Sequence, residues 1–205
     1  MKIIKASYEI MTPIDREYIL KTIEKAGRVC YKSEDRITEE SAGKFVKMLI
    51  SRSHEAMIEH ASITVKFIVD RGVSHELVRH RIASFAQEST RFCNYSKDKF
   101  GNEITIIEPC FNTWDQLLYD TWKESCEWAE RYYFNLLNKG ASPQEARSVL
   151  PNSLKTEVVM TANLREWRHF FKLRTAQATH PQMREVTIPL LNELKEKLPE
   201  IFEDI

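Results

Sequence analysis

The chain has 205 residues, of which 42% are hydrophobic, and such a chain can bury the core of one sizeable domain. Thirty basic residues balance thirty acidic ones, which argues against a general binder of nucleic acid or of membrane surfaces. The four cysteines show no C-x-x-C spacing, and no apolar run approaches the ~20 residues that span a bilayer. We therefore expect one domain over residues 1–205 in the reducing cytoplasm, with no metal site and no membrane anchor.

Hydrophobic periodicity and turn residues predict both strands and helices in the first half of the chain. The helix that follows Thr38 would place His54 just past its end. The expected elements are a strand over residues 2–9, a helix begun by Thr12 and Pro13 and ending near Gly27, a helix over 38–50, a strand over 63–69, a turn over 70–72 and a short helix begun by Ser74.

The second half is expected to be mostly helical, after a polar and variable excursion over residues 94–109 with a short strand over 104–107. Large apolar residues recur at core-like spacing over residues 114–138, which favours core packing or a subunit contact over a cofactor site. The other expected elements are a helix begun by the capping box 142–145, a strand over 158–162, a helix capped by Asn163 and a helix from Pro181 to about Leu198. Together the elements predict one α/β domain.

Arginine, histidine and hydroxyl side chains gather in residues 79–92. Guanidinium groups bind phosphate bidentately and stack on flat rings, so this cluster indicates a nucleotide. If residues 73–81 are helical, Arg79 and Arg81 point apart and serve two ligands or two parts of one. The polar residues after Arg81 favour a turn with free N–H groups for phosphate. A solvated basic surface is the alternative, but it would not need the interleaved aromatic residues.

Basic side chains in the second half add to this interpretation. Arg147 would lie in the first two turns of a helix, where the helix N-terminus adds N–H donors and partial positive charge toward an anion. Arg165 and His169 are four residues apart and would share a helix face. His54 and His60 do not have the H-E-x-x-H spacing of a zinc site, so a metal site there is disfavoured.

The spacing Arg79-His80-Arg81, seven residues, Ser89, one residue and Arg91 resembles the signature of the flavin-dependent thymidylate synthases. The resemblance covers about residues 38–189, with an unmatched stretch over 97–128. Further elements match in the family's order, namely His54–His60, Ala146–Pro151, Asn163–Arg165 and Leu173–Arg174. The sequence departs from the usual family pattern with Glu76, Met57 and Ala86-Gln87.

The resemblance implies reductive methylation of 2'-deoxyuridine 5'-monophosphate (dUMP) to dTMP. The implied carbon donor is 5,10-methylenetetrahydrofolate, the redox carrier is FAD and the reductant is NADPH. The resemblance also implies a central, mainly antiparallel sheet flanked by helices, and a homotetramer whose sites take residues from more than one chain. The balanced charge of the chain, in contrast, is the reason not to expect nucleic acid or a membrane as a partner.

Arg174 matches the family arginine that lies against the pyrimidine, where a fixed cation stabilises negative charge developing on the ring. It is the expected catalytic residue. The residues implied to bind the substrate are Glu76, Arg79, Gln87, Glu88, Ser89, Thr90, Arg91, Arg147 and Arg174. The residues implied to bind the cofactor are His54, Arg79, His80, Arg81, Gln87, Asn163, Arg165 and His169.

Two other classes of protein compete with this enzyme. A non-catalytic nucleotide- or single-strand RNA-binding module would use the arginines with Phe85, Phe92 and Tyr95, and its affinity would fall steeply with salt. A degenerate relative acting as a structural subunit is the other alternative, and the retained Arg147 and Arg174 argue against it.

Overall fold

The computed structural model describes residues 1–205, except for the side chain of Lys99. Contacts divide the chain into two compact units. The first unit comprises residues 1–7, 67–79 and 86–158, and the second comprises residues 8–66, 80–85 and 159–205. The single domain expected over residues 1–205 stays a prediction.

The strands belong to two sheets. The larger has the order β2 (Ser7–Ile10), β3 (Ser62–Asp70), β6 (Lys155–Asn163) and β4 (Ala83–Gln87). The smaller pairs β1 (Lys2–Ile4) in parallel with β5 (Thr105–Ile107). The Thr64 and Thr161 hydroxyls meet at 2.9 Å and Ala61 accepts a hydrogen bond from the Leu164 N–H, so β3 and β6 are antiparallel. The single strand expected over 2–9 is wrong, because its two halves join different sheets.

The helices and the larger sheet together confirm the predicted mixed α/β class with an antiparallel sheet. Among the described residues, no helix is both long enough and apolar enough to cross a membrane. The α-helices are α1 (Arg16–Val29), α2 (Ser41–Ser51), α3 (Arg71–Leu77), α4 (Gln116–Asn138), α5 (Pro143–Ala146), α6 (Leu164–Arg174), α7 (Pro181–Lys197) and α8 (Pro199–Phe202). The 3-10 turns are η1 (Glu34–Arg36), η2 (Glu55–His60), η3 (Asp98–Phe100) and η4 (Arg147–Val149).

Two helices begin at carboxylates rather than at the hydroxyl residues expected from the sequence. Asp15 caps α1 by accepting a hydrogen bond from the Tyr18 N–H at 3.0 Å, three residues after the predicted Thr12. Asp70 caps α3 by accepting a hydrogen bond from a first-turn N–H at 2.6 Å. Strand β3 therefore runs directly into α3, and the turn predicted over 70–72 is the start of that helix.

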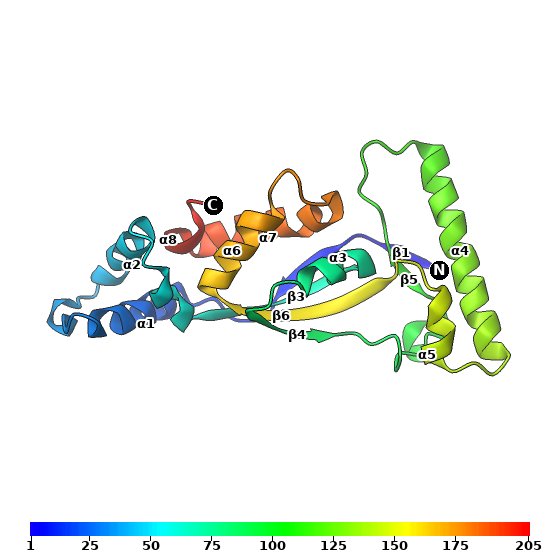
Figure 1. The fold of residues 1–205 in the computed structure, drawn as a ribbon, viewed down its shortest axis with the longest axis horizontal. Helices are drawn as coiled ribbons and strands as arrows, with labels where there is room; N and C mark the ends of the chain where they lie inside the picture. Colours follow the sequence, from blue (N-terminus) through cyan, green and yellow to red (C-terminus); the bar gives the residue numbers. More distant parts are fainter. The chain divides into compact units, whose positions relative to one another are not determined.

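The core of the first unit lies against β5 and α4, which Figure 1 shows as the longest helix ribbon. Ile104 and Ile106 are fully buried, together with Tyr133 from α4 and the nearly buried Tyr95. The segment 94–109 was expected to be a variable excursion. It instead supplies part of this core, because it leads into the strand that pairs with β1.

Helix α4 has one buried edge and a broad exposed face. Leu117 is 73% exposed, Tyr132 is 54% exposed and Trp128 is 44% exposed. Trp128 stacks on Tyr132 with ring centroids 6.0 Å apart, and the Arg131 guanidinium lies 4.5 Å from the Trp128 ring centroid. The predicted core role is therefore wrong for these positions within one chain. The alternative, a subunit contact, stays a prediction.

The core of the second unit is built around α6, which lies beside α7 and α8 (Figure 1). Trp167, Phe170 and Phe171 are fully buried and form the apolar face of this helix. Trp167 stacks on Phe171, and its indole N–H donates a hydrogen bond to the Ile63 carbonyl at 3.0 Å. Phe171 also packs edge-on against Phe202 of α8. These contacts fix α6 against β3 and the C-terminal helices.

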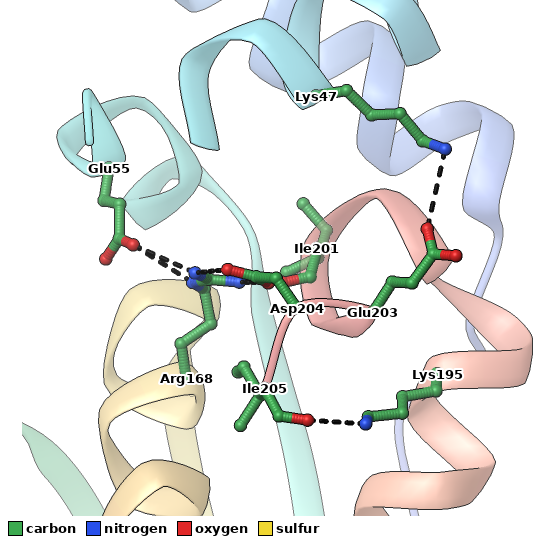
Figure 2. A network of polar contacts seen from close by, with 8 residues as sticks. All are labelled: Lys47, Glu55, Arg168, Lys195, Ile201, Glu203, Asp204 and Ile205. Carbon is green, nitrogen blue, oxygen red and sulfur yellow. Dashed lines mark hydrogen bonds and ion pairs between the residues drawn. The ribbon is translucent and has the colours of Figure 1, made fainter. Parts of the chain in front are cut away.

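A buried arginine on α6 joins three parts of the second unit (Figure 2). Arg168 is 2% exposed and donates two hydrogen bonds to Asp204, at 2.6 and 2.8 Å. It also forms an ion pair with Glu55 of η2 at 3.1 Å and donates a hydrogen bond to the Ile201 carbonyl. The guanidinium thereby ties η2 and the C-terminal segment to α6, and a buried charge is tolerated because it is fully paired.

Two carboxylates near the C-terminus are expected to make the protein less stable at acid pH. Hydrogen bonds from Arg168 lower the pKa of Asp204 below its ordinary 3.8, and those from Arg16 lower the pKa of Glu200 below 4.5. Both groups therefore stabilise the fold above their ordinary pKa and lose that contribution as the pH falls through the lowered values. We expect the melting temperature to fall as the pH drops below about 4.5, with a shallower fall in Asp204→Asn. An Asp204→Asn protein with the same pH dependence as the wild type would contradict this.

Candidate functional site

The arginine-rich segment is not helical. Helix α3 ends at Leu77, and Arg79 and Arg81 are exposed on either side of the buried His80. The turn expected directly after Arg81 is instead strand β4. The turn lies further on, where the Ser89 carbonyl accepts hydrogen bonds from two N–H groups of the following residues, at 2.9 and 3.1 Å. Of the polar residues predicted to form a phosphate-binding turn, only those after β4 lie in a turn.

A pocket of about 460 Å³ lies in the first unit and is rich in basic side chains. Its lining includes Arg71, His75, Thr90, Arg147 and Asn152, and we call it the Arg147 pocket. The Arg147 guanidinium donates a hydrogen bond of 3.3 Å to the Thr90 hydroxyl, which is nearly buried. The structure thus brings together two predicted substrate-binding residues that are 57 positions apart.

Arg147 owes its position to a short helix, although not in the way that the sequence suggests. The predicted capping box is confirmed, since the Ser142 N–H donates to Glu145 at 2.8 Å and Ser142 also receives the reciprocal bond. Helix α5 has only four residues, however, and Arg147 lies at its C-cap. The expectation that a helix N-terminus assists Arg147 is therefore wrong.

Two basic residues of the Arg147 pocket were missed by the sequence analysis. Arg71 and His75 lie four residues apart on α3, so they share a face of that helix. Arg71 donates long hydrogen bonds of 3.4 Å to the Glu88 carbonyl and to the Thr156 hydroxyl. Their i, i+4 spacing was the available signal, but it was obscured because a turn was expected at Arg71.

Gln87 and Glu88 already have partners within the first unit. The Gln87 amide donates hydrogen bonds to the Ser74 hydroxyl at 3.0 Å and to the Thr156 hydroxyl at 3.3 Å. The Glu88 carboxylate accepts from Lys155 at 2.9 Å and from the Tyr95 hydroxyl at 3.2 Å. These contacts fix both side chains, and the ligand contacts predicted for them stay predictions.

The remaining substrate candidates of the first unit lie around the loop after β4 and on α3. The Ser89 hydroxyl accepts a hydrogen bond from the Arg91 N–H at 3.3 Å. The exposed Arg91 guanidinium lies 5.3 Å from the ring centroid of Phe92, which is also exposed. Glu76 is half-buried on α3. The structure thus leaves the Arg91 guanidinium accessible to an anion.

In the second unit, Arg174 at the end of α6 is held by a buried histidine. Its Nε donates a hydrogen bond of 2.9 Å to Nε2 of His80, and Nδ1 of His80 lies 3.1 Å from a Glu166 carboxylate oxygen. Burial lowers the pKa of His80, because desolvation penalises the charged imidazolium. Both ring nitrogens are therefore engaged within this unit, and the flavin contact predicted for His80 stays a prediction.

The same region has side chains that could bind a metal ion, but a positive charge lies next to them. Ligand atoms of His80, Glu166 and His169 lie within 4.8 Å of one another. A metal ion there would lie next to the Arg174 guanidinium and would have to displace the proton between His80 and Glu166. We therefore interpret the group as a hydrogen-bonded chain.

The other predicted cofactor residues of the second unit are divided between structural and exposed positions. Asn163 caps α6 as predicted, since its side chain accepts a hydrogen bond from the Glu166 N–H at 2.9 Å. Arg165 and His169 are exposed on α6, and Arg165 forms an ion pair with Glu59 at 2.6 Å. His54 is exposed at the start of η2. The exposed side chains are available to a ligand.

Comparison with known proteins extends these observations. Residues 16–200 match the profile of the family described as "Thymidylate synthase complementing protein". The flavin-dependent thymidylate synthase of Pyrococcus furiosus is 33% identical over 185 residues, which cover 87% of this chain and 75% of that protein. That of Corynebacterium aurimucosum is 32% identical over 200 residues, covering 89% of this chain and 78% of its own.

A solved structure shares the fold. The UMP/dUMP methylase PolB from Streptomyces cacaoi, crystallised with 5-Br dUMP, superposes with a TM-score of 0.82 over 99% of this chain and 96% of that chain. The two sequences are 23% identical, so this likeness shows the fold alone. Together the comparisons define an enzyme of the methyltransferase class. The chain belongs to the flavin-dependent thymidylate synthase family, and the resemblance found in the sequence is confirmed.

Proposed function

We propose that this protein converts dUMP to dTMP, with 5,10-methylenetetrahydrofolate as carbon donor, FAD as redox carrier and NADPH as reductant. The observation that carries the proposal concerns Arg174, which stands at the motif position assigned to the pyrimidine. Its guanidinium is held there by a neutral histidine. The dUMP analogue bound to the structural neighbour supports a uracil nucleotide as the substrate.

Arg174 would act as the catalytic residue by stabilising charge on the pyrimidine. C5 of uracil is a weak nucleophile until negative charge that develops on the ring is stabilised. A guanidinium remains charged at physiological pH, and one held in place before the substrate arrives stabilises this charge without reorganisation. The hydrogen bond to His80 supplies that fixed orientation.

The Arg147 pocket would bind the phosphate of dUMP. Arg147 presents a guanidinium beside the Thr90 hydroxyl, and the pocket adds Arg71 and His75. Charge-assisted hydrogen bonds of this kind favour a phosphate dianion. The full set that we propose to contact the substrate is Glu76, Arg79, Gln87, Glu88, Ser89, Thr90, Arg91, Arg147 and Arg174.

The second unit offers donors that fit FAD. The pyrophosphate of FAD is anionic, and Arg81, Arg165 and His169 are exposed side chains that can donate hydrogen bonds to it. The surface ion pair of Arg165 with Glu59 is weak enough to exchange for a phosphate. When bound, reduced FAD would supply the hydride for the transferred carbon. The proposed cofactor residues are His54, Arg79, His80, Arg81, Gln87, Asn163, Arg165 and His169.

We also propose the homotetramer that is typical of the family, with active-site residues from more than one chain. The exposed face of α4, with Leu117, Trp128 and Tyr132, supplies apolar surface for such an assembly. The cytoplasmic location expected from the sequence stays a proposal as well.

Spectrophotometry of the purified protein tests the proposed function. The protein is expected to bind FAD and appear yellow, to lose its visible absorbance when NADPH is added under anaerobic conditions, and to change its flavin spectrum when dUMP binds. A protein that takes up no FAD on titration, and binds single-stranded RNA with a steep salt dependence instead, would support the competing class.

Arg147→Ala is expected to raise the KM for dUMP more than it lowers kcat. A hydrogen bond from a charged group is worth about 1.5–3 kcal/mol, which corresponds to about a 10- to 150-fold weaker affinity. Steady-state kinetics of dTMP formation at varied dUMP would measure the change. Lys139→Ala, at the exposed end of α4, is the control. A KM that stays at the wild-type value would exclude Arg147 from the phosphate site.

A further inference from the structure

We propose that Glu166 and His80 are positioning residues that orient Arg174 for the reaction. The inference rests on the proposed function, in which Arg174 contacts the pyrimidine. Glu166 lies in the first turn of α6 and Arg174 is its last residue, and His80 bonds to both, at 3.1 and 2.9 Å. The histidine therefore fixes the guanidinium relative to the start of its own helix.

The hydrogen-bond chemistry permits one arrangement of protons. The Nε–H of Arg174 can only donate, so Nε2 of His80 must carry a lone pair. The ring proton of neutral His80 is then on Nδ1 and is donated to the Glu166 carboxylate, which only accepts when ionised. The main chain of Glu166 is held at the start of α6, because the Asn163 side chain accepts a hydrogen bond from its backbone N–H. The chain thus runs from guanidinium to imidazole to carboxylate in one direction.

The surroundings of His80 keep this chain in place. His80 is 5% exposed, and the Phe170 ring packs edge-on against it with centroids 4.9 Å apart. The charged and titratable groups that face it are Glu166, Arg174 and His169, whose ring centroid is 6.0 Å away. Burial is the main cause that lowers its pKa; the hydrogen bond to Glu166 opposes this, the positive charge of Arg174 adds to it, and the net direction is downward. His80 therefore stays neutral at physiological pH.

Protonation of His80 would break the arrangement. An imidazolium has no lone pair on Nε2, so it cannot accept from Arg174, and the two cations would repel each other. Because the pKa of His80 is lowered below the ordinary 6.5, protonated His80 accumulates only at pH values below that, and its hydrogen bond from Arg174 is then lost. The rate of dTMP formation should therefore decrease on the acid side through this one group.

The test uses the full-length FAD-bound enzyme and three variants. His80→Phe removes both hydrogen bonds but keeps a planar ring against Phe170. His80→Gln retains an oxygen that can accept from Arg174 but does not titrate. Glu166→Gln keeps the shape of Glu166, but its uncharged amide can either accept from Nδ1 or donate to it, so the ring proton of His80 is no longer fixed on Nδ1. Lys172→Gln, exposed in the last turn of α6, is the control.

In His80→Phe and Glu166→Gln we expect kcat to fall by about tenfold or more, because a displaced catalytic group costs about that much or more. The KM for dUMP should change far less in both variants, and so should the amount of FAD bound to Glu166→Gln. FAD bound to His80→Phe is measured separately, because His80 is also a proposed cofactor residue. His80→Gln should recover part of kcat and lose the acid limb of the pH profile that the wild type shows. Lys172→Gln should behave as the wild type.

The outcomes separate the inference from the proposed function. Wild-type enzyme that forms no dTMP would overturn the proposed function and this inference with it. If the wild type is active, normal kcat and an unchanged pH profile in His80→Phe and Glu166→Gln would overturn the inference alone. Loss of FAD from His80→Phe with normal kcat at saturating FAD would also overturn it, and would assign His80 to the flavin.

Discussion

Arg174→Ala is expected to retain FAD and lose most dTMP formation, with kcat reduced by about 10²- to 10³-fold. That is the usual cost of removing one preorganised donor that stabilises charge in the transition state. The side chain is at the end of α6, outside the Trp167 and Phe171 core, so the fold should survive its loss. Flavin absorbance, circular dichroism and dTMP formation under single-turnover conditions would measure the three properties separately.

The neighbouring residues supply the controls for this result. Lys172→Ala removes an exposed cation from the same helix turn and should leave turnover unchanged. Arg174→Lys keeps the charge but loses the planar fork, so its activity should lie between that of Arg174→Ala and the wild type. Turnover in Arg174→Ala equal to that of the wild type would refute the catalytic role of Arg174.

Arg168→Ala is expected to destabilise the protein by about 3–5 kcal/mol, the usual effect of breaking a buried ion pair by removing one partner. The loss leaves Glu55, Asp204 and the Ile201 carbonyl without their shared donor (Figure 2). It also removes the hydrogen bonds that join the C-terminal segment to α6. Urea unfolding at one fixed protein concentration would give the free energy of unfolding, since assembly makes stability depend on concentration.

A surface ion pair provides the comparison for Arg168. Lys123 and Glu127 are both exposed on α4 and lie 3.9 Å apart, so Lys123→Ala should change the free energy of unfolding by less than about 0.5 kcal/mol. Arg168→Ala that costs as little as Lys123→Ala would show that the network in Figure 2 contributes little to stability.

The sequence predicts correctly those elements whose local pattern fits only one kind of secondary structure and one starting residue. Strand β3 alternates without interruption, and Asn163 precedes a helix with a clear apolar face, so both were placed correctly. The errors occur where two cap residues compete, as for α1 and α3, because the sequence does not show which side chain meets the free N–H groups. Helix α4 shows a second limit, since its apolar spacing alone does not distinguish a core from an exposed face.

The site was predicted through the family motif and less well through local chemistry. The motif identified Arg147 and Arg174, but the helix N-terminus expected to assist Arg147 is absent at that residue because α5 ends there. Glu166 was not assigned any role, although it completes the chain through His80 to Arg174. His80 and Arg174 are 94 positions apart, and no periodicity or spacing in one sequence reports such a contact.

The transfer of a labelled carbon tests the central claim most directly. The purified enzyme would be supplied with FAD, NADPH, dUMP and 5,10-methylenetetrahydrofolate labelled in its methylene carbon, and the nucleotide product would be analysed by mass spectrometry. We expect dTMP that carries the label in its methyl group, formed only when the flavin can be reduced. Unchanged dUMP in the presence of fully reduced flavin and the labelled donor would contradict the account.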